Sequence, residues 1–217
     1  MEKAADRRAR VRSIIRVLKK TYPDVRLALD FNTPLELLIA LILAAQCTDD
    51  RVNRVTPGLF RKYRKAMDWM EAERHVLEEE IHSTGFFRQK AAAIQKCAKE
   101  LVERFNGEVP RKLDDLLSLP GVGRKTANIL RGNAFGDPAI GVDTHVSRLS
   151  LRLGLTKQTD PDRIEAALTD LVPRAAQVKF CPLIQRHGRE ICIARKPKCD
   201  TCGLRDLCPR IGVVGSA

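Results

Sequence analysis

The sequence predicts an all-α fold, because its apolar residues recur at the spacing of helices and nowhere at the spacing of strands. Intervals of three and four residues place apolar side chains on one face of a helix. This spacing is found over residues 67–81, 91–105, 113–119 and 164–172. No stretch sustains the strict apolar–polar alternation of a half-buried strand. The connectors between these segments contain glycine or proline, which indicates that the helices end there.

The first helix with a well-defined start is predicted at Thr33. Thr33 has a side chain typical of an N-cap, Pro34 suits the first helical position, and Glu36 stands where its carboxylate can bond back to the cap. Residues 37–45 then contain no polar side chain, which is typical of a helix buried on all sides. We therefore expect this helix at the centre of the core.

Composition predicts the class of partner. The chain has 39 Lys+Arg against 27 Asp+Glu, a net charge of +12, and such a surplus attracts polyanions, nucleic acid first. Residues 1–20 alone carry eight basic side chains, although a solvated helix face would have the same composition. Residues 1–10 lack the apolar stretch of a secretory signal, and no apolar run approaches the ~20 residues that span a membrane. We expect a soluble, monomeric, cytoplasmic protein that is not secreted, and one associated with the nucleoid if the source is prokaryotic.

Four cysteines near the C-terminus have the spacing of ligands to an inorganic centre. Cys192, Cys199, Cys202 and Cys208 follow the pattern Cys-x6-Cys-x2-Cys-x5-Cys, in a 17-residue window too short to build its own apolar core. A metal cross-link would hold such a loop, whereas disulfides are disfavoured because nothing indicates secretion. Zinc remains an alternative, but all-cysteine zinc sites usually have two close cysteine pairs, and only Cys199 and Cys202 form one. The spacing favours a [4Fe-4S] cluster.

Residues 113–134 predict a helix-hairpin-helix. A short amphipathic helix reaches Leu117, a tight turn follows, and a second helix begins at Arg124. Gly121 and Gly123 would let bare backbone approach a phosphate oxygen, and the start of the second helix offers unpaired N–H donors. Arg124 can add a charged contact. An ordinary turn between two helices is the plainer interpretation of the same residues.

Two residues in or near this element are candidates for catalysis. Lys125 lies in the first turn of the second helix, where the positive end of the helix dipole disfavours an added cation and so favours the neutral, nucleophilic amine. Asp143 lies further along and could face that amine if the chain turns back at residues 136–138. The structural readings are a surface or phosphate-binding lysine and an aspartate that caps the helix starting at Thr144. Spacing alone favours these structural readings.

The combination of motifs resembles the endonuclease III family of DNA glycosylase/AP lyases. The resemblance rests on Leu-Pro-Gly-Val-Gly-Arg-Lys-Thr-Ala at 119–127, Val-Asp-Thr-His at 142–145 and the four-cysteine tail. Further matches lie at residues 37–40, 45–49, 106–110, 187–189 and 192–197. The resemblance therefore covers nearly the whole chain.

This resemblance implies an architecture of two domains. Residues 27–137 would form a six-helix barrel that carries the helix-hairpin-helix at about 113–134. Residues 1–26 and 138–217 would form a helical [4Fe-4S] cluster domain with its cluster loop at 192–208. DNA would be held between the two domains.

The resemblance also implies roles for single residues. Lys125 would be the nucleophile that attacks C1′ of a damaged nucleotide, Asp143 its acid partner, and His145 a support beside that aspartate. Gln46 would enter the duplex where the flipped nucleotide leaves it, and Phe86, which stands where the family commonly has leucine, would be a wider wedge. Three cations of the cluster loop suit phosphate contact better than packing, namely Arg195, Lys196 and Lys198.

The implied function is base-excision DNA repair. The protein would be a bifunctional DNA glycosylase that removes oxidised pyrimidines from double-stranded DNA and nicks the abasic site by β-elimination through a lysine Schiff base. One alternative is an adenine-mismatch-type glycosylase, which shares the hairpin, the aspartate and the cluster but lacks the lysine. The other is a non-catalytic DNA-binding protein, which would need neither Lys125 nor Asp143. The presence of both residues favours the bifunctional enzyme.

Overall fold

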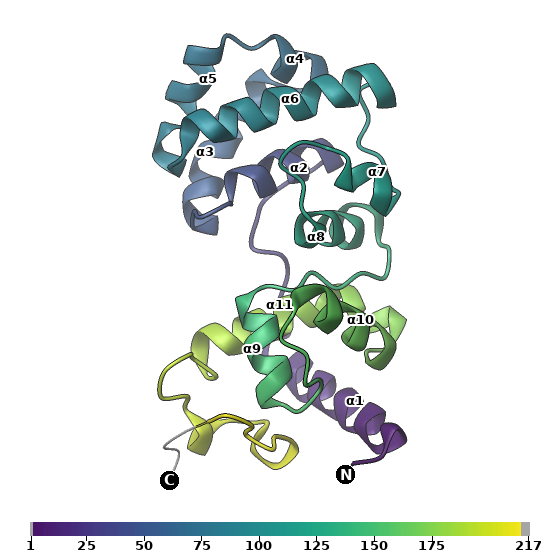
Figure 1. The fold of residues 1–217 in the computed structure, drawn as a ribbon. Helices are drawn as coiled ribbons and strands as arrows, with labels where there is room; N and C mark the ends of the chain where they lie inside the picture. Colours follow the sequence, from purple (N-terminus) through teal and green to yellow (C-terminus); the bar gives the residue numbers. More distant parts are fainter. Residues whose placement is uncertain (1, 214–217) are drawn as a thin grey trace. The chain divides into compact units, whose positions relative to one another are not determined.

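The computed structural model describes residues 2–213, and every regular element in that range is a helix (Figure 1). The all-α class predicted from the sequence is confirmed. The chain forms two compact units: unit 1 contains residues 1–26 and 136–217, and unit 2 contains residues 27–135. Each unit has its own apolar core. None of the helices described is long and apolar enough to cross a lipid bilayer.

Unit 2 is a barrel of helices around one apolar core. Its elements are α2 (Pro34–Leu43), α3 (Asp49–Lys62), α4 (Ala66–Glu71), α5 (Arg74–Glu80), η1 (His82–Thr84), α6 (Phe87–Phe105), α7 (Leu113–Leu117) and α8 (Arg124–Phe135). The apolar spacing over residues 67–81 runs on without a break, but the structure divides this segment into α4 and α5. Ala72 and Glu73 separate the two helices, because their ψ angles of 133° and 119° are extended.

Helix α2 begins where the sequence predicts. The Thr33 hydroxyl accepts a hydrogen bond from the Glu36 backbone N–H at 3.2 Å, and Pro34 occupies the first helical position. The Glu36 carboxylate accepts from the Asn32 backbone N–H at 2.6 Å, so the reciprocal bond of the cap falls one residue before the predicted place. The helix ends at Leu43, two residues before the end of the apolar run.

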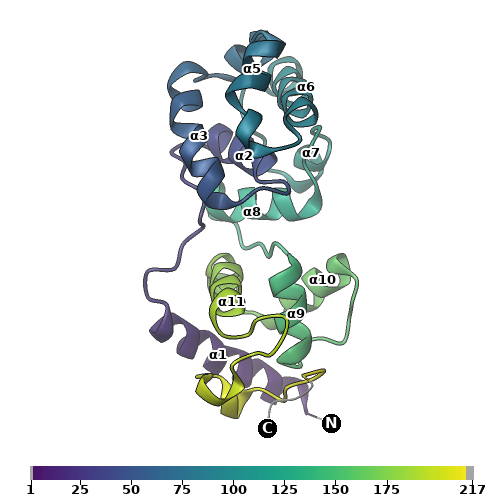
Figure 2. The same cartoon turned by 90° about the vertical axis from the view of Figure 1, so that its left-hand side faces the viewer.

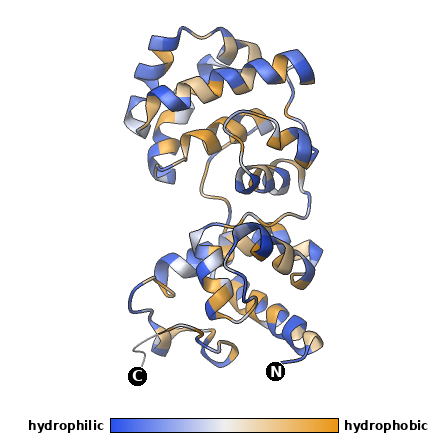
Figure 3. Cartoon of the chain, in the orientation of Figure 1, coloured by the Kyte–Doolittle hydropathy of each residue, from blue (hydrophilic) through white to orange (hydrophobic). Residues whose placement is uncertain are grey.

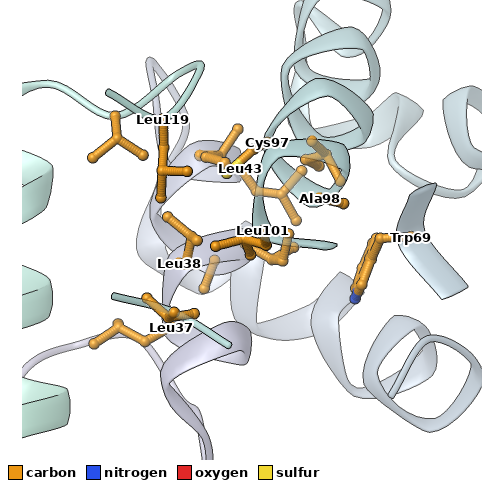
Figure 4. Packing of buried hydrophobic residues seen from close by; sticks show 14 of the residues in the cluster. Leu37, Leu38, Leu43, Trp69, Cys97, Ala98, Leu101 and Leu119 are labelled. Carbon is orange, nitrogen blue, oxygen red and sulfur yellow. The ribbon is translucent and has the colours of Figure 1, made fainter. Parts of the chain in front are cut away.

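Helix α2 is also the centre of the unit 2 core, as expected. Figure 3 shows apolar colouring along it, and α3, α6 and α8 pack against it. In Figure 4, Leu38 and Leu43 lie in one packed cluster with Cys97 and Leu101 of α6. All four residues are fully buried, and truncating a leucine at such a site costs about 2–5 kcal/mol. The loop that follows α2 therefore starts from a rigid base.

Unit 1 combines the N-terminal helix with the segment that follows unit 2 (Figures 1 and 2). Its elements are α1 (Ala4–Thr21), α9 (Thr144–Arg152), α10 (Pro161–Leu171), η2 (Arg174–Ala176), α11 (Gln177–Glu190), η3 (Cys199–Thr201) and η4 (Arg205–Leu207). Val11, Ile14 and Leu18 form the buried face of α1, which packs against α10 and α11. This face ties the start of the chain to the segment that carries the four cysteines.

Candidate functional site

The predicted helix-hairpin-helix is present in unit 2, where α7 and α8 are its two helices. Gly121, in the turn, has a φ of +81°, and a Cβ there would lie 3.2 Å from the Ala93 Cβ, so this position requires glycine. A Cβ at Gly123 would meet no described atom within 4 Å. Both glycines are exposed. The turn therefore presents open backbone to the solvent, as a phosphate-binding loop requires.

Lys125 is the second residue of α8, and its side chain is exposed. The Gly123 carbonyl accepts the first bond of the helix, from the Ala127 N–H at 2.9 Å. The first N–H groups of a helix have no carbonyl acceptor within that helix. Such groups and the positive end of the helix dipole favour an anion, and the exposed Lys125 amine stands next to them.

Asp143 is the N-cap of α9, as the simpler of the two interpretations of the sequence predicted. Its Oδ1 accepts from the Val146 backbone N–H at 2.8 Å, and its Oδ2 accepts from Nε2 of Gln185 at 3.0 Å. These two bonds fix the orientation of the carboxylate. Each oxygen keeps a further lone pair, so the capping role is compatible with a second role in chemistry. Asp143 belongs to unit 1 and Lys125 to unit 2.

His145 is connected to the cluster loop through Arg148. Its Nδ1 lies 3.0 Å from Nη2 of Arg148, which also donates to the carbonyls of Gly188 and Cys192. A Cβ at Gly188 would lie 2.7 Å from the His145 Nδ1, so only glycine permits this approach of α9 to α11. His145 is thus part of the packing that holds the helix capped by Asp143.

The four cysteines line one cavity in unit 1, together with Leu149, Leu153 and Leu204. Its other described lining residues include basic side chains and no carboxylate. Burial raises the pKa of the Cys202 and Cys208 thiols, and the charges of the neighbouring cysteines raise it further. Thiolates gathered in this way need a metal cation to compensate their charge, and the basic lining suits the net negative charge of a thiolate-bound cluster. The donor set therefore fits a [4Fe-4S] cluster.

Besides Arg148, two further arginines that sequence analysis did not single out hold the cluster loop. Arg152 of α9 donates to the Ile193 carbonyl at 2.8 Å, and its Nη1 lies 3.4 Å from Sγ of Cys192. Arg10 of α1 donates to the Leu207 carbonyl at 3.0 Å. Part of the N-terminal basic run is therefore used inside unit 1.

His187 links the cluster loop to α1. It is buried, and burial lowers the pKa of its ring, which favours the neutral imidazole. Its Nε2 lies 3.4 Å from Sγ of Cys202, and its Nδ1 lies 3.2 Å from the Tyr22 hydroxyl. A ring protonated at Nε2 satisfies both neighbours, because it donates to the sulfur and accepts from the tyrosine.

The remaining predicted contact residues lie on exposed loops. Gln46 and Phe86, in unit 2, have left-handed backbone with φ of +52° and +49°. The Phe86 side chain is 56% exposed, although residues of its size and polarity are usually buried. Arg195, Lys196 and Lys198, in the cluster loop of unit 1, are exposed as well. All five side chains are presented to the solvent and available to a large ligand.

The residues missed by sequence analysis gave only weak signals. Arg148 and Arg152 are four residues apart, which places them on one face of α9, but a solvated face has the same spacing. No pattern in the sequence distinguishes Arg10 from its basic neighbours. His187 falls within a matched motif, yet its contacts with Tyr22 and Cys202 become visible only in the fold.

Comparison with known proteins agrees with the geometry. Residues 39–174 match the family model of the HhH-GPD superfamily base excision DNA repair protein. Residues 192–208 match the iron-sulfur binding domain of endonuclease III. The second match spans all four cysteines, so the cofactor is the [4Fe-4S] cluster and not the zinc ion that the spacing had left open.

Individual relatives cover almost the full length of the chain. Endonuclease III of Synechocystis sp. is 52% identical over 210 residues, 96% of each chain, and that of Escherichia coli K12 is 38% identical over 195 residues, 90% of this chain and 92% of the relative. A non-covalent endonuclease III–DNA complex has a TM-score of 0.88 and 42% identity, with 97% of each chain covered. A trapped covalent endonuclease III–DNA intermediate gives the same values. The chain belongs to the HhH-GPD superfamily of base excision DNA repair proteins and, within it, to the endonuclease III family.

Proposed function

We propose that the protein removes oxidised pyrimidines from double-stranded DNA and then cleaves the strand at the abasic site. The observation that carries this proposal is the exposed Lys125 in the first turn of α8, directly after the open turn of the helix-hairpin-helix. Membership of the family supports the reaction class. The trapped covalent intermediate of a relative is the kind of species that an amine nucleophile forms with DNA.

In the proposed reaction, the neutral Lys125 amine attacks C1′ of the damaged nucleotide, and the base leaves with the glycosidic bond electrons and a proton. The nitrogen lone pair then opens the sugar ring at the C1′–O4′ bond, O4′ takes up a proton, and a protonated Schiff base forms between C1′ and the lysine nitrogen. Loss of a C2′ proton then expels the 3′ phosphate, which is the β-elimination that nicks the strand. Asp143 stabilises the positive charge that develops at C1′.

The hairpin holds the strand during these steps. The exposed backbone N–H groups of Gly121 and Gly123, the start of α8 and the Arg124 guanidinium bind phosphate oxygens. Phosphate contacts position the duplex but carry no sequence information. Recognition of the lesion therefore depends on how easily the damaged base leaves the stack, and oxidised pyrimidines leave more easily because they have lost aromaticity.

The cluster loop supplies a second phosphate-binding surface. Cys192, Cys199, Cys202 and Cys208 would hold the [4Fe-4S] cluster, which when bound supplies a cross-link between distant points of the loop. Arg152 and His187 fix the loop at two of the sulfurs. The held loop presents its exposed cations to DNA.

The partner and location follow the same proposal. The protein acts as a monomer on duplex DNA in the cytoplasm, at damaged or abasic nucleotides. An adenine-mismatch-type glycosylase lacks the lysine, and a protein that only binds DNA needs neither Lys125 nor Asp143. The presence of both residues therefore favours the proposed function over the two alternatives.

Neutralising the cluster-loop lysines is expected to weaken DNA binding without regard to damage. Lys196→Gln/Lys198→Gln should make the slope of log K against log salt shallower by ~1 to 2, since each lost phosphate contact removes just under one unit. Fluorescence anisotropy at several salt concentrations, on lesion-bearing and undamaged duplexes, measures this slope. Lys96→Gln/Lys99→Gln in α6 removes the same charge elsewhere and is the control. An unchanged slope in the loop variant contradicts a DNA contact there.

Gln46→Ala is expected to impair base removal selectively. If Gln46 fills the space left by the flipped nucleotide, its loss should slow base release from a paired lesion by ~10-fold or more, since unstacking a paired base costs a few kcal/mol. Cleavage at a pre-formed abasic site, where little stacking must be broken, should change much less. Single-turnover rates on the two substrates test this, and equal losses on both would show that Gln46 does not assist extrusion.

Borohydride trapping on duplexes that each carry one defined lesion tests the function as a whole. The wild-type protein should form a covalent adduct with duplexes that contain an oxidised pyrimidine or an abasic site. It should form none with undamaged duplex. Base release from an adenine mismatch without strand cleavage would favour the first alternative, and tight binding with no base release on any duplex would favour the second.

A further inference from the structure

Lys90 of α6 is a buried cation in the middle of unit 2. Only 4% of its surface is exposed, and its Nζ donates to the Leu43 carbonyl at 2.7 Å and to the Thr84 carbonyl at 2.8 Å. Burial lowers the pKa of this lysine, while the nearby Cys47 acts in the opposite direction. A buried ammonium group is unfavourable unless it is fully hydrogen-bonded, so a lysine at this position calls for a specific explanation.

Both acceptors stand at the ends of helical elements. Leu43 is the last residue of α2, and Thr84 is the last residue of η1. Carbonyls at helix ends have no partner within the helix, and a cation there also complements the negative end of the helix dipole. One ammonium group therefore fixes where two separate elements stop and where the loops after them begin.

Each of these loops leads directly to a predicted duplex-contacting residue. Gln46 lies three residues after Leu43, and Phe86 lies two residues after Thr84. Both are exposed and both have left-handed backbone, a conformation that non-glycine residues keep only when their surroundings hold it. The backbone N–H of Lys90 also donates to the Phe86 carbonyl at 3.0 Å. This bond belongs to the first turn of α6, so the two side-chain bonds are what a lysine adds at this position.

We propose that Lys90 is a positioning residue that sets Gln46 and Phe86 at a fixed separation, so that both side chains enter the duplex together. The proposal rests on the proposed function, in which these two residues contact DNA, and it adds a residue that touches neither DNA nor the reacting atoms. A lysine serves here because its ammonium group has three donors and can bond two carbonyls at once. An apolar side chain would fill the same space and leave both carbonyls unpaired.

Lys90→Met tests the proposal, since methionine is also unbranched, is only one atom shorter than lysine, and removes the donors. The expected result is a loss of ~10-fold to 100-fold in base release from a paired lesion, the range that a misplacement of about 1 Å produces. Trapping at a pre-formed abasic site should stay within ~3-fold of wild type, because little extrusion is needed there. Adding Gln46→Ala to Lys90→Met should cost less than Gln46→Ala costs in the wild-type protein.

Leu77→Ala is the control for a merely structural role. Leu77 is fully buried in α5, so the substitution destabilises unit 2 without removing a bond to either loop. Leu77→Ala should lower base release from the paired lesion and trapping at the abasic site by the same factor, so the ratio of the two rates should stay at the wild-type value. A Lys90→Met variant with the same unchanged ratio overturns the proposal. Wild-type trapping at the abasic site is measured in parallel, so a failure of the proposed function is recognised separately.

Native-state hydrogen exchange on the wild-type protein gives a test that does not depend on the folding of the variant. The Cys47 N–H donates to the Ala44 carbonyl and the Gly85 N–H to the His82 carbonyl, both at 3.2 Å, so each loop has a protected amide. If Lys90 joins the loops, both amides exchange through one opening event with the same denaturant dependence. Openings with different denaturant dependence overturn the proposal.

Discussion

Replacing Lys125 with alanine is expected to abolish covalent trapping by borohydride, because the variant has no amine at the start of α8 to form the Schiff base. Base release should fall by on the order of 10³-fold or more, the usual consequence of removing a nucleophile. DNA affinity should stay within ~10-fold of wild type, since the open turn and the cluster-loop cations keep their phosphate contacts. Trapping gels and anisotropy on the same abasic duplex measure both quantities.

Lys99→Ala is the matched control for the lost charge. Lys99 is an exposed lysine in α6, where its Nζ lies 3.6 Å from a Glu103 carboxylate oxygen, and the two residues form an i,i+4 pair of little energetic weight. This variant should form the adduct at the wild-type rate. An adduct formed at the wild-type rate by Lys125→Ala would show that another group is the nucleophile.

Replacing any one of the four loop cysteines with alanine is expected to remove the cluster and most of the soluble protein. Anaerobically purified wild type should be yellow-brown, with about four irons and four sulfides per chain. The 17-residue loop has little apolar surface of its own, so the cluster holds its shape. A domain is stable by only ~5–15 kcal/mol, and losing such a cross-link removes a large part of that margin.

Cys97→Ala separates this effect from the loss of a cysteine as such. Cys97 is fully buried in the unit 2 core, and burial raises its pKa to about 12, so it is an unreactive thiol. The variant should keep the full iron content and lose only some stability. Iron and sulfide analysis with thermal melts tests the series, and a soluble, colourless Cys202→Ala protein with wild-type stability would contradict the structural role of the cluster.

The sequence predicted the features that depend on interactions between residues a few positions apart, such as helix caps and turns. The N-cap at Thr33 and the cap at Asp143 were visible because a cap is set by residues three or four positions apart. The break at Ala72 and Glu73 was not visible, because both residue types favour helices, and the Ala72 carbonyl accepts a hydrogen bond from Gln95, 23 residues away. The helix that carries Lys125 was predicted from its glycine turn.

Contacts between distant residues are what the sequence could not show. Lys90 bonds to a carbonyl 47 residues away, and Arg152 bonds to the Ala194 carbonyl 42 residues away. The type of each residue is compatible with an exposed face, and only the folded chain reveals the acceptor. The cysteine spacing was informative for the opposite reason, since its ligands lie within one short segment.

The composition of unit 1 implies an order of events during synthesis. Helix α1 is made first, but α10 and α11, which cover its apolar face, leave the ribosome only after the whole of unit 2. At ~5–20 residues per second, that face waits on the order of ten seconds while unit 2 folds. Cys208, the last of the four ligands in the sequence, completes the ligand set only after α11 has been made. A cell short of iron would therefore accumulate chains whose hairpin is folded but whose first helix has no finished domain to join.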